Sequence, residues 1–230
     1  MKEHLYTIPV NDAFSKDCEC PICAMYKSLE VAAIDYTMGP SYMEDDIRAQ
    51  SDKEGFCSKH IKLMYANQNR LGLTLMLSTH MDKTMQNIET YIKTGKPQAS
   101  SLFKKAAPSD IASYIKEIEG SCFVCNRIQR TFDRYLATIF HMYKTDKDFC
   151  NKFKASKGLC TRHFGKLHEL APDHLRGDTF QEFIRDLNEV YLSNMKRVRE
   201  DLEWFRDKFD YRNADAPWKN SKDALPRSII

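Results

Sequence analysis

The stretch CECPIC, residues 18–23, places three thiols and a proline within six positions. Its last two cysteines form a Cys-x2-Cys pair, and a Cys-x2-His pair follows after 33 residues. The second half of the chain repeats this order, with 34 residues between its two pairs. Two copies of a four-ligand set in one order indicate metal binding far more strongly than a lone Cys-x2-Cys would. The pairs are Cys20 with Cys23, Cys57 with His60, Cys122 with Cys125, and Cys160 with His163.

The two halves are also alike around these ligands. The first pairs are offset by 102 residues and the second pairs by 103, which is the pattern of a tandem duplication with one inserted residue. Gly55 and Gly158 each precede the third cysteine by two positions. A glycine there predicts a backbone with positive φ, which would turn the chain tightly enough for its ligands to converge.

The ligand spacing predicts two structural zinc sites, one in each half. A Cys-x2-Cys step at one helix start and a Cys-x2-His step in the first turn of another helix can build a closed tetrahedral Cys3His site. Three thiolates on one Zn²⁺ leave about one negative charge, which Lys59 and Arg162 could offset. The expected sets are Cys20, Cys23, Cys57 and His60 for one ion, and Cys122, Cys125, Cys160 and His163 for the other.

Other interpretations of the cysteines stay open. An iron–sulfur cluster accepts a similar ligand set. A redox dithiol at Cys20/Cys23 or Cys122/Cys125 would leave the Cys-x2-His pairs unexplained. Merely buried cysteines would show no order or repetition. The remaining two, Cys18 and Cys150, are expected to be free thiols, with a spare ligand or exchange thiol as the alternative.

Apolar residues at helical spacing predict an all-α fold, a helical bundle built from two tandem zinc-tied repeats. No segment shows the alternation of a strand. Asp178 and Gln181 predict a capping box at the start of a helix of roughly eight turns. The expected parts are a first Cys3His unit over residues 1–95, a linker over 96–110, a second unit over 111–212 with a long C-terminal helix, and an extended tail over 213–230.

Composition limits the classes of function. The 230 residues are 42% hydrophobic and carry a net charge of +3, so the chain can form a core and has no broad footprint for nucleic acid or anionic lipid. No signal-peptide or membrane-spanning run is present, which predicts a cytoplasmic protein. In that reducing compartment eight cysteines are better explained by metal ligation or redox chemistry than by disulfides.

A resemblance to a known family is carried by the runs CECPIC, GPSYMEDDIR, GFCSKH, NRLGLTLMLSTH and PWKNSKDALPR. On these runs the chain resembles an uncharacterised bacterial family, domain-of-unknown-function family 6062. The likeness covers essentially the whole chain, and the family is found mainly in anaerobic Gram-positive bacteria. The resemblance implies no activity. It draws attention to three stretches outside the ligands, namely YMEDDIR, NRLG with the following TH, and SKDALPR.

Other polar residues have weaker functional interpretations. Glu44, Asp45 and Asp46 could do acid–base work, but a solvated helix start explains them more simply. His80 and His141 lie in apolar helical runs, where a buried hydrogen-bonded histidine is the simpler reading.

No phosphate loop, nucleophile elbow, dinucleotide fingerprint, di-iron motif or zinc-protease signature occurs. We therefore expect a non-enzymatic zinc scaffold that binds an unidentified protein partner. A redox or iron–sulfur protein is the alternative. Nucleic-acid binding through Arg127, Arg130 and Arg134 ranks below both.

Overall fold

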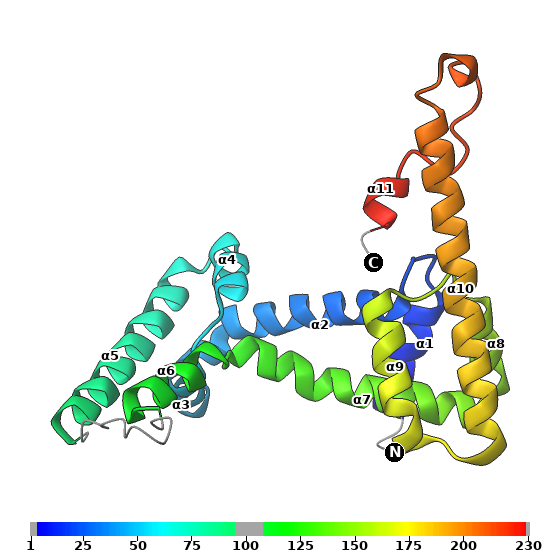
Figure 1. Cartoon of the computed structure of the whole chain (residues 1–230). Coiled ribbons are helices and arrows are strands. Elements are labelled where there is room, and N and C mark those ends of the chain that lie inside the picture. The colour runs from blue at the N-terminus through cyan, green and yellow to red at the C-terminus, as the bar shows by residue number, and fades with distance from the viewer. Residues whose placement is uncertain (1–3, 95–107, 229–230) are drawn as a thin grey trace, which may run out of the picture. The chain divides into compact units, whose positions relative to one another are not determined.

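A computed structural model describes residues 4–94 and 108–228, and within these ranges the chain forms helices and no strand (Figure 1). The predicted all-α class is confirmed. Most of the predicted linker, 96–110, lies outside the described residues. The helices are α1 (His4–Ser15), α2 (Pro21–Met38), η1 (Pro40–Met43), α3 (Asp45–Glu54), α4 (Ser58–Ala66), α5 (Arg70–Thr94), α6 (Asp110–Glu119), α7 (Phe123–Thr145), α8 (Lys147–Ala155), α9 (Thr161–His174), α10 (Gly177–Asp207), η2 (Tyr211–Asn213) and α11 (Ala224–Arg227).

The chain divides into two compact units that do not follow the predicted sequence halves. Unit 1 consists of Met1–Lys27 and Phe132–Ile230, and unit 2 consists of Ser28–Thr131. The boundaries fall inside α2 and inside α7. Each unit therefore contains one ligand pair from each half of the sequence, with the two outer pairs in unit 1 and the two inner pairs in unit 2. In the described part of the chain, no helix combines the length and the apolar character needed to cross a membrane.

Unit 1 has an aromatic core. Phe140, Phe149, Phe153 and Phe183 are at most 1% exposed. The ring centroids of Phe140 and Phe183 lie 5.1 Å apart, and those of Phe153 and Phe183 lie 5.4 Å apart. Large rings from α7, α8 and α10 are buried in one place, and this apolar burial helps to hold these helices together.

A buried carboxylate is built into the edge of this core. Asp186 of α10 is 5% exposed. It accepts a hydrogen bond of 2.5 Å from the Tyr143 hydroxyl, and its carboxylate lies 3.0 Å from Lys154 Nζ. Burial would raise the pKa of Asp186, but these two partners hold it below its usual value, so the carboxylate stays charged.

Tyr143→Phe should therefore destabilise the protein by about 1.5–3 kcal/mol, because a buried carboxylate loses a hydrogen bond. Tyr211→Phe is the matched control, since Tyr211 is 87% exposed and should change stability by less than about 0.5 kcal/mol. Urea denaturation of the three proteins measures both effects. Equal midpoints for the Tyr143 variant and the wild type would contradict this account of the core.

In unit 2, α5 packs against α3 through polar contacts as well as apolar ones. Thr79 Oγ1 donates to Asp52 Oδ1 (2.5 Å), and the ring nitrogen Nδ1 of His80 lies 2.8 Å from the Asp52 carbonyl oxygen. At the start of α5, the Asn69 side chain accepts from Gly72 N–H (2.9 Å) and donates to the Met38 carbonyl (2.8 Å). The family-like stretch from Asn69 to His80 thus joins α5 to its neighbours.

The acidic cluster Glu44–Asp46 is the solvated helix start that the sequence favoured. Glu44 is the N-cap residue of α3, and Asp45 and Asp46 lie in its first turn, all three exposed. Asp46 Oδ1 accepts from the N–H of Ile47 (2.9 Å). Asp46 thus satisfies one helix amide, and all three carboxylates complement the dipole of the helix N-terminus. His80 packs elsewhere as a hydrogen-bonded residue.

The predicted capping box of α10 is wrong. Arg176 is the N-cap residue, it makes no side-chain cap, and Gly177 follows with φ of 56°. The backbone turn at this glycine starts the helix one residue before Asp178, which leaves Asp178 inside the first turn.

The segment after α10, predicted as an extended tail, folds back along α10 and ends in α11 (Figure 1). Lys208, only 8% exposed, donates from Nζ to the carbonyls of Asn213, Ala214 and Ala216. Trp204 Nε1 donates to the Pro217 carbonyl (3.0 Å). A buried lysine that satisfies three carbonyl groups fixes the shape of this turn, which includes the short helix η2.

Candidate metal centres

The eight predicted ligands gather into two groups of four, each at the N-termini of two helices. Centre A lies within unit 1 and uses the starts of α2 and α9. Centre B lies within unit 2 and uses the starts of α4 and α7. In each centre all four ligand atoms lie within 4.8 Å of one another, so each could hold one metal ion. Centre A is Cys20, Cys23, Cys160 and His163, and centre B is Cys57, His60, Cys122 and Cys125.

The predicted grouping within each sequence half is therefore wrong. Each centre takes its Cys-x2-Cys pair from one half and its Cys-x2-His pair from the other. The physical reason is the helix that separates the pairs. From Cys23, its third residue, α2 carries the chain about 22 Å along the helix axis to Met38, well before it reaches Cys57. The ligand spacing fixes each local pair but not which pairs meet.

The atoms of centre A are spaced as a single tetrahedral ion requires. The Sγ atoms of Cys23 and Cys160 lie 3.6 Å apart. His163 Nδ1 lies 3.5, 3.3 and 3.1 Å from the Sγ atoms of Cys20, Cys23 and Cys160. Zn–S bonds of about 2.3 Å and Zn–N bonds of about 2.0 Å imply separations of about 3.8 Å for S···S and about 3.5 Å for S···N. The donor set fits a zinc ion.

Centre B repeats this geometry. Cys57 Sγ lies 3.9 Å from Cys125 Sγ. His60 Nδ1 lies 3.3 Å from the Sγ atoms of Cys57 and Cys125, and 3.4 Å from that of Cys122. The two S···S separations are far longer than the bond of about 2.0 Å in a disulfide, and all eight cysteines are free thiols.

Helix starts supply hydrogen bonds to the sulfurs. Cys57 and Cys160 are the N-cap residues of α4 and α9, with nearly the same backbone, φ −72° and ψ 158° against φ −71° and ψ 156°. Within the Cys-x2-Cys pairs, Cys23 N–H donates to Cys20 Sγ (3.4 Å) and Cys125 N–H donates to Cys122 Sγ (3.5 Å). Amides without a helical partner thereby favour the thiolate form.

The N-cap cysteines also have the lowered pKa that metal ligands need. Burial would raise the pKa of Cys57, but the backbone N–H of His60 and the thiols of Cys122 and Cys125 lower it. In centre A, hydrogen bonds from the thiols of Cys20 and Cys23 lower the pKa of Cys160. Each centre thus has one sulfur poised as a thiolate at the helix start, and a bound ion would favour the same form of the others.

The glycines before these N-cap cysteines have positive φ, as predicted, with 63° at Gly55 and 155° at Gly158. The Gly55 carbonyl accepts from Phe123 N–H (2.9 Å), which joins the loop before Cys57 to the start of α7. At Gly158 an added Cβ would lie 2.3 Å from the Asn194 side chain. Both positions need glycine for the backbone angle and for the space.

Gly158→Ala should destabilise the protein by at least about 1–3 kcal/mol, because alanine is strained at this backbone angle and its Cβ would clash with Asn194. Gly165→Ala is the matched control. Gly165 is an exposed helical residue of α9 with no atom within 4 Å of an added Cβ, so alanine should stabilise the helix by roughly 0.5–1 kcal/mol. Thermal melting with zinc present measures both. The two variants should change the melting temperature in opposite directions. An unchanged melting temperature for Gly158→Ala would refute the need for glycine at this position.

The two centres differ in what supports the histidine. In centre B, Glu30 Oε1 lies 3.3 Å from His60 Nε2 and also binds Lys59 Nζ. Burial would raise the pKa of Glu30, but Lys59 and His60 hold it low, so Glu30 is a carboxylate. The position 102 residues later is Phe132, whose ring centroid lies 5.8 Å from that of His163. Neither residue was predicted from the sequence, although each lies two helical turns after a Cys-x2-Cys pair, Glu30 after Cys23 and Phe132 after Cys125.

Glu30→Gln should weaken metal binding at centre B about 10–100-fold, because the carboxylate fixes the orientation of His60 and increases its basicity. Centre A has no residue changed and serves as the internal control. Competition with a chromophoric chelator should then show a lower metal affinity at centre B and an unchanged metal affinity at centre A. Equal loss at both centres, or no loss, would contradict this role.

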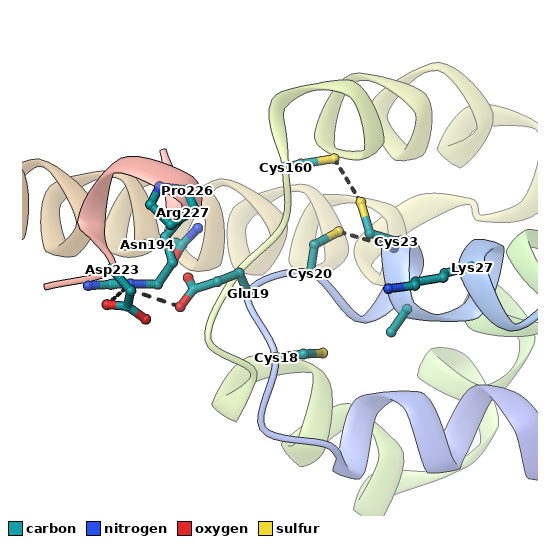
Figure 2. A pocket seen from close by; sticks show the side chains of 11 residues that line it. Cys18, Glu19, Cys20, Cys23, Lys27, Cys160, Asn194, Asp223, Pro226 and Arg227 are labelled. Atoms are coloured by element: carbon teal, nitrogen blue, oxygen red, sulfur yellow. Dashed lines mark hydrogen bonds and ion pairs between the residues drawn. The ribbon is translucent and has the colours of Figure 1, made fainter. Parts of the chain in front are cut away.

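A cavity of about 500 Å³ adjoins centre A (Figure 2). Figure 2 shows Cys23 and Cys160 pointing toward each other, with Glu19, Asp223 and Arg227 on another side. Cys18, which is not a ligand, also lines it, and burial together with the charge of Cys20 raises the pKa of its thiol. Lys27 extends along it from α2.

The arginines considered for nucleic-acid binding already have partners within the protein. The Arg127 guanidinium lies 3.4 Å from the centroid of the Tyr36 ring. Arg130 lies 3.8 Å from Glu54, and Arg134 donates to the Tyr6 hydroxyl.

Comparison with known proteins gives one match. A family model described as a family of unknown function, DUF6062, matches residues 1–230. No curated protein and no solved structure matches the chain.

Proposed function

We propose that this chain, which belongs to the DUF6062 family of unknown function, is a helical scaffold held by two structural Zn²⁺ ions and used to bind another protein. The observation that carries the proposal is that both crossed groups of three sulfurs and one imidazole have the separations of a closed tetrahedral site. A closed site has no open position for a substrate, so it stabilises the fold rather than activating water.

The spacing favours a single ion over an iron–sulfur cluster. A cluster binds its ligands through different iron atoms and would hold the four ligand atoms further apart than one ion does. All ligand atoms of each centre lie within 4.8 Å of one another. A redox or iron–sulfur protein with the same ligands is the second candidate, because the donor set alone also suits iron.

Local electrostatics support a doubly charged ion with three thiolates. Such a centre carries about one negative charge, and two helix N-termini meet at each centre with partial positive charges of about 0.5 each. Because the helix N-termini already offset the negative charge of each centre, the positive charges of Lys59 and Arg162 are not required for this purpose. Lys59 instead binds Glu30, and Arg162 is exposed.

The proposal includes a reducing compartment, the cytoplasm, where these thiols stay available to zinc. It includes a protein partner rather than nucleic acid, because the three candidate arginines are engaged by Tyr36, Glu54 and Tyr6.

Metal analysis of protein purified without oxygen tests the proposal. Two zinc ions per chain and a colourless solution are expected. A brown solution that absorbs near roughly 400 nm, with iron in place of zinc, would favour the iron–sulfur candidate.

Paired substitutions test the crossed grouping itself. Cys20→Ser with Cys160→Ser changes two ligands of centre A and should leave one zinc per chain. Cys20→Ser with Cys57→Ser changes one ligand in each centre and should leave none, since losing a ligand weakens a structural site severely. If the ligands were grouped within sequence halves, the first double variant would keep no zinc and the second would keep one zinc per chain. Zinc content after gel filtration distinguishes the two outcomes.

A further inference from the structure

Four cysteine side chains open onto the cavity beside centre A. Three of them, Cys20, Cys23 and Cys160, are ligands, and the fourth is Cys18 (Figure 2). Cys18 has no counterpart in the other half of the chain, because the position 102 residues later is Gly120. Centre A therefore has a spare thiol supplied from within its own ligand loop.

The ligands of centre A are not equally accessible. Cys23 is exposed, Cys18 is half-buried, and Cys20 is only 7% exposed. A solute entering the cavity therefore reaches Cys23 more easily than Cys20. A reactive thiolate must be accessible as well as nucleophilic, so Cys23 is the ligand most open to attack.

A short stretch of chain joins Cys18 to Cys23. Only four residues separate them, which gives their thiols a high effective concentration. Residues 16–20 are not helical, lying between the end of α1 at Ser15 and the start of α2 at Pro21. The loop can rearrange to bring the sulfurs together without breaking a helix.

We propose that Cys18 and Cys23 form a peroxide-sensitive modification site, in which oxidation joins them in a disulfide and opens centre A. This proposal rests on the proposed zinc occupancy. The Cys23 thiolate attacks a peroxide oxygen, the O–O bond breaks, and Cys23 becomes a sulfenic acid. The Cys18 thiol then displaces the sulfenic oxygen as water and forms the S–S bond. Two electrons pass from two sulfurs to one hydrogen peroxide, which takes up two protons in all and leaves as two waters.

Oxidation leaves only three of the four ligands of centre A for the ion, Cys20, Cys160 and His163. Zinc is then held by two thiolates instead of three and is released to a chelator. The loop also contains Glu19, which binds Arg197 of α10 and lies 3.9 Å from Arg227 of α11. Rearrangement of this loop loosens the hold on α11, so the oxidised scaffold presents a different C-terminal surface.

The test uses the full chain, first reduced and analysed for zinc, then treated with hydrogen peroxide in the presence of a chromophoric zinc chelator. Wild type should release one zinc per chain, and peptide mapping should find the Cys18–Cys23 disulfide. Cys18→Ser should lose the disulfide and keep Cys23 as a sulfenic acid, which a sulfenic-acid-specific label detects in the same peptide map. Cys150→Ser is the matched control, because Cys150 lies on α8 outside both centres and should behave as wild type.

No sulfenic acid at Cys23 in oxidised Cys18→Ser, or a disulfide joining Cys20 to Cys23 in oxidised wild type, would overturn the proposal. A reduced protein without zinc at centre A would instead contradict the proposed function. Peptide mapping of the same oxidised sample would still decide whether Cys18 and Cys23 form the disulfide.

Discussion

The meeting of a Cys-x2-Cys helix start with a Cys-x2-His helix start is the constraint on which this structure depends. Two such meetings occur, one between α2 and α9 and one between α4 and α7. At each, amides that lack helical partners and two helix dipoles face sulfurs that carry negative charge when they bind an ion. The glycines with positive φ, Gly55 and Gly158, turn the chain just before the N-cap cysteines, so the loops as well as the helices serve these two junctions.

The two centres have the same ligand types but different surroundings. Centre B has Glu30 on its histidine, which is the arrangement expected where an ion must be held firmly. Centre A has Phe132 against its histidine, a cavity of about 500 Å³ beside its sulfurs, and Cys18 in its ligand loop. Under the proposed function, centre B would hold the fold together, and centre A would be the site that responds to oxidants.

Much of the architecture could be read from the sequence because the signals are local. The helix starts at the ligand pairs and the turns at the two glycines all depend on residues within a few positions. All eight residues of the two centres were identified by spacing alone. The grouping of the pairs could not be predicted from the sequence. It depends on the position in the fold to which α2 and the chain after it bring Cys57. Glu30 and Phe132 could not be assigned either, since each is recognisable only once the opposing histidine is in place.

The crossed grouping makes the two closures nested, with centre B inside centre A. Centre B joins residues 68 apart in the chain and centre A joins residues 137 apart, so closing A first would cost about 0.6 kcal/mol more in chain entropy. Once B has formed, the path left to A shrinks to two segments of 33 and 34 residues. During synthesis on the ribosome, Cys20 and Cys23 emerge early, and centre A is complete only when residue 163 of the 230 has been made. A newly made chain therefore passes through a stage in which centre B can already form while Cys20 and Cys23 still lack the other two ligands of centre A.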